Sequence, residues 1–210
     1  MKRIHLVAML ALLLPVTSQA QGWYAGLDVG SVRSDAKINE NFLGQTTARS
    51  TDITTGFRVR GGYQLWKWFA VELAYVDLGQ LESHFDPDEC PPIGSNPCPL
   101  DIRTSRSGLL GTLRFMVPIR SHWFVDARLG WGKMDTDVSE VGGEGLDGDI
   151  EDVVFQYGIG GGYRFDDHWE IAVDYSEYNQ EDFGETLSGD FGLYNLGESS
   201  VSSIGIAYRW

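Results

Sequence analysis

The feature of this chain that most restricts its fold is a period-two alternation of apolar and polar residues, which recurs in eight segments. Successive side chains of a β-strand point to opposite faces, so each segment has one apolar face and one polar face. The predicted strands are 22–34, 53–65, 69–79, 104–117, 123–134, 153–165, 169–178 and 200–210. This pattern predicts an all-β protein.

The connections between these segments alternate in length. Tight turns are predicted at 65–68, 118–122 and 166–168, and long loops at 35–52, 80–103, 135–152 and 179–199. Short turns at one end and long loops at the other are typical of an up-and-down barrel that crosses a bacterial outer membrane. We therefore expect eight antiparallel strands in a closed transmembrane β-barrel.

One face of these strands is apolar, and the other carries charges with glycines between them. The predicted inward, charged face comprises Asp28, Arg58, Arg60, Glu72, Arg114, Asp126, Arg128, Arg164, Glu170, Asp174 and Arg209. A soluble β-sandwich would alternate in the same way, with its charges in water. Small residues beside the charges, aromatic residues at the strand ends and an aromatic C-terminus favour the membrane barrel. No apolar run after residue 20 has the roughly 20 residues of a transmembrane helix.

The first 20 residues have the form of a secretory signal peptide. Lys2 and Arg3 precede an apolar stretch over 6–16, and a small-x-small cleavage site lies at 18–20. We expect cleavage after Ala20, which leaves residues 21–210 as one barrel domain.

Cys90 and Cys98 lie in a proline-rich stretch of an exported chain. A close cysteine pair in an oxidising compartment favours a disulfide that closes a small loop. Two free thiols are the alternative. A metal site is not expected, since His84 is the only histidine nearby.

Four short motifs follow one another in a characteristic order. They are Gly61-Gly62-Tyr63-Gln64, Glu72-Leu73-Ala74-Tyr75 before Leu78-Gly79, Arg128-Leu129-Gly130, and 203–210. In order and spacing the chain resembles the eight-stranded transmembrane domain of the outer membrane protein A family, without the peptidoglycan-binding domain that some relatives append.

This resemblance implies an outer-membrane location and a lumen filled by paired charges. It also implies that Tyr208 and Trp210 form a C-terminal signal for the outer-membrane assembly machinery. The expected partners are membrane lipid, lipopolysaccharide, periplasmic chaperones and that machinery, and the expected state is a monomer. Asp28 replaces a residue that is usually basic in the family. Gly162 and Ala172 replace an acidic and a basic partner, so we expect a less tightly plugged lumen.

Charge is divided unevenly along the chain, whose formal net charge is −14. Five acids and six arginines nearly cancel on the predicted lumen face, so the acidic excess falls in the predicted loops. The segment 135–152 has eight acids and no Lys or Arg. Such carboxylates would share divalent cations with lipopolysaccharide or simply keep the surface hydrated. The stretch 142–149 resembles a single calcium-binding glycine-rich repeat, but these repeats work in tandem, so no metal or cofactor is assigned.

Three functions follow, in order of preference. The first is a structural and surface-interaction role in the cell envelope through long acidic extracellular loops. The second is a narrow porin-like channel for ions or small solutes. The third is a lipid A-modifying enzyme. We assign no catalytic residues, because His84 is the only histidine predicted on the extracellular side. The acidic charge opposes nucleic-acid binding.

Overall fold

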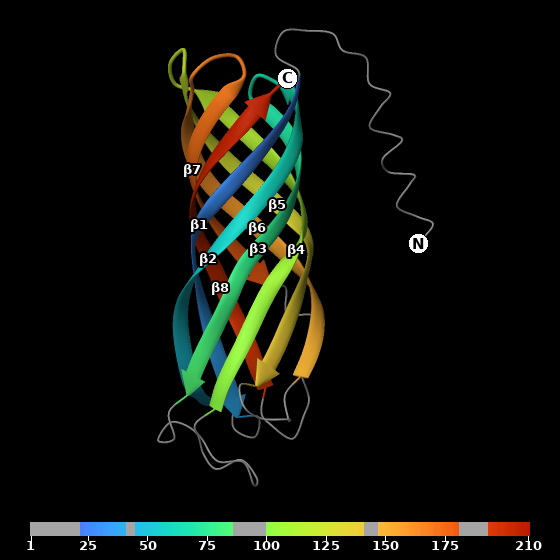
Figure 1. The fold of residues 1–210 in the computed structure, drawn as a ribbon, viewed down its shortest axis with the longest axis vertical. Helices are drawn as coiled ribbons and strands as arrows, with labels where there is room; N and C mark the ends of the chain where they lie inside the picture. Colours follow the sequence, from blue (N-terminus) through green and yellow to red (C-terminus); the bar gives the residue numbers. More distant parts are fainter. Residues whose placement is uncertain (1–21, 41–44, 86–99, 141–146, 181–192) are drawn as a thin grey trace, which may run out of the picture.

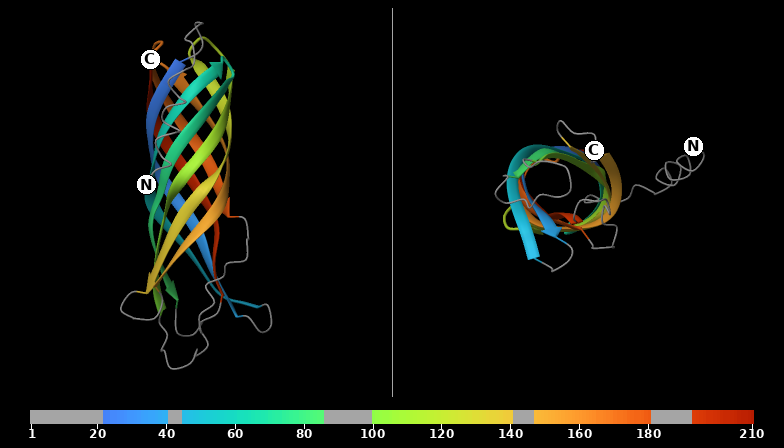
Figure 2. Two further views of the ribbon diagram at one scale, coloured as in Figure 1. Left: turned by 90° about the vertical axis from the view of Figure 1, so that its right-hand side faces the viewer. Right: turned by 90° about the horizontal axis from the view of Figure 1, so that it is seen from below.

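The computed structural model describes residues 22–40, 45–85, 100–140, 147–180 and 193–210. Eight antiparallel strands form one closed barrel, because β8 pairs with β1 (Figures 1 and 2). The strands are β1 (Gly22–Glu40), β2 (Gln45–Trp66), β3 (Phe69–Phe85), β4 (Leu100–Pro118), β5 (Trp123–Glu140), β6 (Asp147–Arg164), β7 (Trp169–Gln180) and β8 (Leu193–Arg209). Within the described ranges there is no helix able to cross a membrane. The predicted fold class is confirmed.

Three tight turns lie at the end of the barrel where β1 begins and β8 ends, at the top of Figure 1. We call it the turn end, and the opposite end the far end. In the β4–β5 turn the backbone N–H of Ile119 donates to Trp123 O over 2.9 Å. In the β6–β7 turn Asp166 accepts hydrogen bonds from the backbone N–H groups of His168 and Trp169, at 2.8 and 2.7 Å. The three predicted turns are confirmed.

The predicted strand lengths and long loops are wrong at the far end. β2 has 22 residues and begins at Gln45, well inside the predicted loop 35–52. β5 continues to Glu140 and β6 begins at Asp147, so most of the predicted loop 135–152 is paired strand. The other two predicted loops are shortened in the same way, since β3 runs to Phe85, β4 begins at Leu100, β7 runs to Gln180 and β8 begins at Leu193.

The physical reason is that the alternation continues toward the far end with its polarity reversed. On β5 the outward residues from 123 to 131 are apolar, but the next outward residues are Lys133, Asp135 and Asp137. The inward residues at the same height are Met134, Thr136 and Val138, and all three are buried. A charged outward face in this stretch has the composition of a loop, although its geometry is that of a strand.

On every strand a polar residue interrupts the outward apolar face toward the far end, and this divides the barrel into two zones. The first polar residues on the outward face toward the far end are Ser31, Thr55, Asp77, Ser107, Lys133, Glu151, Glu177 and Ser202. The membrane zone lies between these residues and the turn end. Its outward apolar stretch covers 23–29 on β1, for example, and 153–163 on β6. These stretches have seven residues on β1 and eleven on β6, on either side of the roughly ten residues with which a strand spans a bilayer. The outer zone lies beyond.

The barrel interior at the boundary between the two zones is a hydrophobic core. This apolar cluster comprises Val32, Ala74, Val76, Leu78, Leu110, Met134, Val154, Tyr178 and Val201, contributed by all eight strands except β2. All nine side chains are buried. Where water lies outside the barrel, burial of each large aliphatic side chain contributes about 1.5–3 kcal/mol. The apolar filling begins at the zone boundary and continues into the outer zone at Met134 and Val138, where Arg106 is also buried.

Candidate functional site

Charged side chains fill the lumen of the membrane zone. The buried members are Asp28, Arg58, Arg60, Glu72, Arg114, Asp126, Arg128, Glu170 and Asp174. Arg164 and Arg209 lie at the turn end and are partly exposed. We call these eleven residues the lumen network. The structure places all the residues of the predicted charged face in it.

One part of the network lies along β1, β2 and β3. Asp28 Oδ2 accepts hydrogen bonds from Arg58 Nε at 2.8 Å and Arg60 Nε at 3.0 Å. Arg60 Nη1 donates to Glu72 Oε1 at 3.0 Å, and the Tyr24 hydroxyl donates to the same oxygen at 2.6 Å. Asp28 lies directly opposite Arg58 in the β1–β2 register. An acid at position 28 therefore faces a base across the ladder.

A second part is centred on Arg114. Its Nη2 donates to Asp126 Oδ2 at 2.5 Å and to Glu170 Oε1 at 2.9 Å. Arg114 lies directly opposite Arg128 in the register, and like charges in this relation are destabilising. Asp126 offsets the repulsion because its Oδ2 also lies 3.6 Å from Arg128 Nη2.

Further contacts connect these parts across the lumen. Asp174 Oδ1, from β7, accepts from Arg58 Nη2 of β2 at 2.7 Å and from Arg128 Nη1 of β5 at 2.5 Å. Each of the five carboxylates pairs with at least two arginines of the network. Ions out of water are costly unless they are paired and hydrogen-bonded. The double pairing explains how the barrel holds them.

Inward glycines provide the space for these side chains. A Cβ added at Gly205 would lie 1.7 Å from Asp28 Oδ1, and one at Gly62 would lie 2.6 Å from the Tyr24 ring. A Cβ at Gly160 would lie 3.0 Å from Asp126 Oδ1. Replacing any of these glycines would require the network to move.

The expectation of a looser lumen at Gly162 and Ala172 is wrong, because a ring fills the space. Ala172 is buried, and a Cβ at Gly162 would meet the Phe124 ring at 2.5 Å. The guanidinium groups of Arg114 and Arg164 lie 5.2 and 5.1 Å from the centroid of this ring. These are cation–π distances, so Phe124 takes the place of an ion pair.

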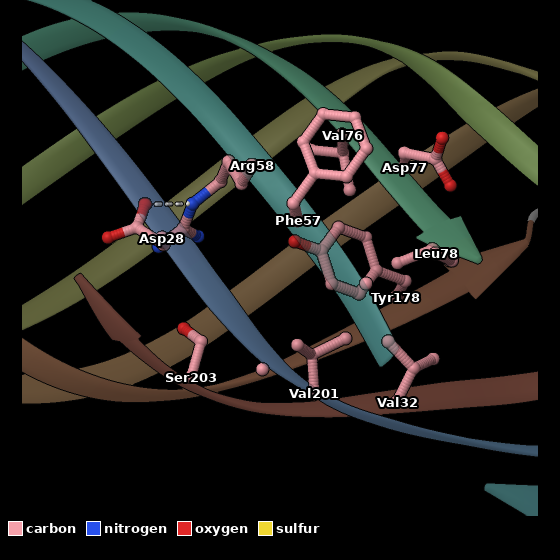
Figure 3. A pocket seen from close by; sticks show the side chains of 12 residues that line it. Asp28, Val32, Phe57, Arg58, Val76, Asp77, Leu78, Tyr178, Val201 and Ser203 are labelled. Carbon is pink, nitrogen blue, oxygen red and sulfur yellow. Dashed lines mark hydrogen bonds and ion pairs between the residues drawn. The ribbon is translucent and has the colours of Figure 1, made fainter. Parts of the chain in front are cut away.

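A cavity of about 10 Å³ lies where the lumen network meets the apolar cluster (Figure 3). Asp28, Arg58 and Ser203 line its polar side, and Val32, Leu78 and Val201 line its apolar side. Its volume matches the smallest space that holds one water molecule. The junction between the lumen network and the apolar cluster is therefore closely packed.

Several interior residues were missed from the sequence. Arg106 is buried in the outer zone, and its Nη1 donates to Ser199 Oγ at 2.9 Å. It has the same inward phase as Arg114, so the alternation contained this signal. The inward phase of Phe124 and Tyr178 was also available, but only charged residues and glycines were assigned to the lumen face.

The predicted assembly residues lie at the turn end. The Tyr208 ring makes edge contacts with Trp169 at 4.9 Å and with Trp210 at 5.6 Å. The backbone N–H of Trp210 donates to Trp23 O at 3.0 Å, so the last residue is tied to β1. The signal peptide 1–20, Cys90, Cys98 and most of the glycine-rich stretch lie outside the described residues. Among the described side chains, none of the His, Cys, Asp and Glu groups is arranged to hold a metal ion.

Comparison with known proteins agrees with this architecture. Similar solved structures include OprG from Pseudomonas aeruginosa, with 14% identity, 93% of this chain and 99% of that one covered, and a TM-score of 0.54. Neisserial surface protein A has 14% identity, coverage of 91% and 100%, and a TM-score of 0.52. Ail, the attachment invasion locus protein of Yersinia pestis, has 15% identity, coverage of 90% and 99%, and a TM-score of 0.49.

At these identities the structural likeness concerns the fold alone. A search of curated proteins finds no significant match. The family model described as outer membrane protein beta-barrel domain, however, matches residues 4–209. The chain therefore belongs to the outer membrane protein beta-barrel domain family, and its place is the bacterial outer membrane.

Proposed function

We propose that this protein is a closed, non-conducting barrel that supports the cell envelope and presents its outer zone as an interaction surface. The observation that carries the proposal is the double filling of the lumen. The ion-paired network blocks the membrane zone, and the apolar cluster blocks the next level. Short periplasmic turns are the rule in such barrels, so we assign the turn end to the periplasm and the outer zone to the cell surface.

The two levels oppose permeation for different reasons. An ion in the membrane zone would have to separate arginine–carboxylate pairs such as Arg58–Asp174. At the apolar cluster it would have to lose its hydration against aliphatic side chains, and hydrophobic constrictions of this kind close pores by dewetting. These features favour a structural role over the narrow channel.

The outer zone supports a surface role through its outward polar residues. Asp135 lies opposite Glu151 and Asp137 lies opposite Asp149 in the β5–β6 register. Lys133 forms an ion pair with Glu151 at the base of this ribbon. An acidic ribbon above the bilayer would meet the carbohydrate of lipopolysaccharide or ligands from outside. We propose no catalytic activity.

Single-channel recording in planar bilayers tests the closed lumen. We expect no discrete conductance from the full barrel, and a stable conductance would contradict the proposal. The surface role is tested by detergent and EDTA sensitivity of a deletion strain. Complementation by the D135N/D137N/E151Q variant should fail, whereas the turn-end variant D166N/D167N should restore resistance. Equal rescue by both would refute a role for the ribbon.

A further inference from the structure

A continuous group of outward aromatic rings lies on one side of the turn end. The rings of Trp66 and Trp68 stack at 5.5 Å with an angle of 13°. Phe69 lies 5.6 and 5.9 Å from these two rings, and 5.1 Å from Phe115 of β4. Trp66 is 52% exposed and Trp68 54% exposed. We call these four residues the aromatic platform.

Two exposed cations lie beside the aromatic platform. Lys67 stands between the stacked tryptophans, and Arg120 lies in the neighbouring β4–β5 turn. The backbone N–H of Met116 donates to Trp68 O at 2.7 Å, so the β2–β3 turn is joined to β4 just before the β4–β5 turn. Within the described part of the chain, neither cation makes an ion pair. In the outer zone, by contrast, Arg103 pairs with Glu82 at 2.7 Å.

Among the described arginines and lysines of the turn end, only Lys67 and Arg120 lack an ion pair, since Arg164 and Arg209 pair with Glu170. The β6–β7 turn, on the far side of the barrel, carries Asp166 and Asp167 instead. An ordinary interfacial aromatic belt needs rings all round but no clustering of charge. The combination of a ring stack and two unpaired cations therefore points to a ligand that has both apolar and anionic parts.

We propose that the aromatic platform, Lys67 and Arg120 bind an anionic glycerophospholipid of the periplasmic leaflet. Tryptophan rings sit at headgroup depth, where they contact the glycerol region and the first methylenes of the chains. Ammonium and guanidinium groups donate charge-assisted hydrogen bonds to phosphate oxygens. Each cation near an anionic lipid surface contributes about 1 kcal/mol, which corresponds to about a five-fold gain in affinity.

Native mass spectrometry of the mature barrel tests this, with phosphatidylglycerol and phosphatidylcholine of identical chains as probes. We expect tighter binding of phosphatidylglycerol, and a loss of about five-fold per cation in K67Q/R120Q. The outer-zone variant R103Q/K133Q removes the same charge and should bind like the wild type. K67R/R120K should retain the preference.

Two results would overturn the proposal. One is equal affinity of the wild type for the two lipids, which would leave an ordinary interfacial belt. The other is an unchanged preference in K67Q/R120Q. The salt dependence of the wild type gives a test that needs no substitution: the preference for phosphatidylglycerol should shrink as ionic strength rises. A preference that is insensitive to salt would also contradict a charge-based site.

Discussion

The membrane zone and the outer zone are built from the same eight strands with opposite polarity. In the membrane zone charges lie inside and apolar side chains outside. In the outer zone the outward face is polar, and the interior holds apolar side chains such as Met134 and Val138 with Arg106 as a buried charge. Lipid outside a barrel provides no hydrophobic drive for an apolar core, so the interior can be polar if it is fully paired. Water outside restores that drive. The surroundings of each zone, lipid or water, thus account for the polarity of its interior.

The largest effect should come from removing the centre of the lumen network. Arg114→Ala leaves the buried carboxylates of Asp126 and Glu170 without their shared partner. Breaking a buried pair in this way costs about 3–5 kcal/mol. Urea unfolding in lipid vesicles, followed by tryptophan fluorescence, measures the change against a Lys67→Ala control at the exposed rim. A loss below about 1 kcal/mol would show that the network is not tightly coupled.

The apolar cluster at the boundary between the zones should respond to a cavity. Leu110 is 0% exposed, whereas its neighbour Leu109 faces lipid and is 55% exposed. We expect Leu110→Ala to lower the free energy of unfolding by about 2–5 kcal/mol and Leu109→Ala by clearly less. Equal losses in the same unfolding assay would contradict an apolar core at the zone boundary.

An outward arginine should distinguish the two zones from outside. Leu73 lies on the outward face of the membrane zone, and Ser107 is the first outward polar residue on β4. Leu73→Arg should cost about 2–4 kcal/mol near the bilayer midplane, and Ser107→Arg should cost about 0–1 kcal/mol. A comparable cost at the two positions would place the zone boundary elsewhere.

The smallest effect concerns the β6–β7 turn. Hydrogen bonds from the Trp169 and His168 N–H groups hold the pKa of Asp166 below its ordinary value. This contribution is present above the unfolded pKa of about 3.9 and disappears as the pH falls through the lower folded value. Asp166→Ala should therefore destabilise the barrel slightly near neutral pH, and the difference from wild type should vanish in acid. A difference that grows in acid would contradict this sign.

The membrane zone could be predicted from the sequence because its inward and outward residues differ strongly in polarity. Charges such as Arg58 and Arg60 alternate with bulky apolar residues, so strand phase and lumen face follow directly. The strands of the outer zone could not be predicted, because Asp135 and Asp137 lie in an acidic stretch whose composition is typical of a loop. Only the inward phase of Met134 and Val138 reveals the strand.

The lumen residues could be predicted, but their partners could not. The Arg58–Asp174 pair joins β2 to β7 across the lumen, and no local spacing specifies such a contact. For the same reason, the sequence did not reveal that Phe124 fills the space at Gly162 and Ala172, where the family has an ion pair. Which side chain fills the space at Gly162 depends on the opposite strand, not on its own.

A spin-label scan of β5 tests the central claim, the reversal of polarity along the barrel, most directly. Single cysteines at positions 123–139, in a chain with Cys90 and Cys98 replaced by serine, are labelled and reconstituted in bilayers. We predict that outward positions up to 131 are accessible to oxygen, and that 133, 135 and 137 are accessible to a water-soluble nickel complex. Positions 134, 136 and 138 should be closed to both reagents. Nickel access at these inward positions, or oxygen access at 135 and 137, would contradict the two-zone barrel.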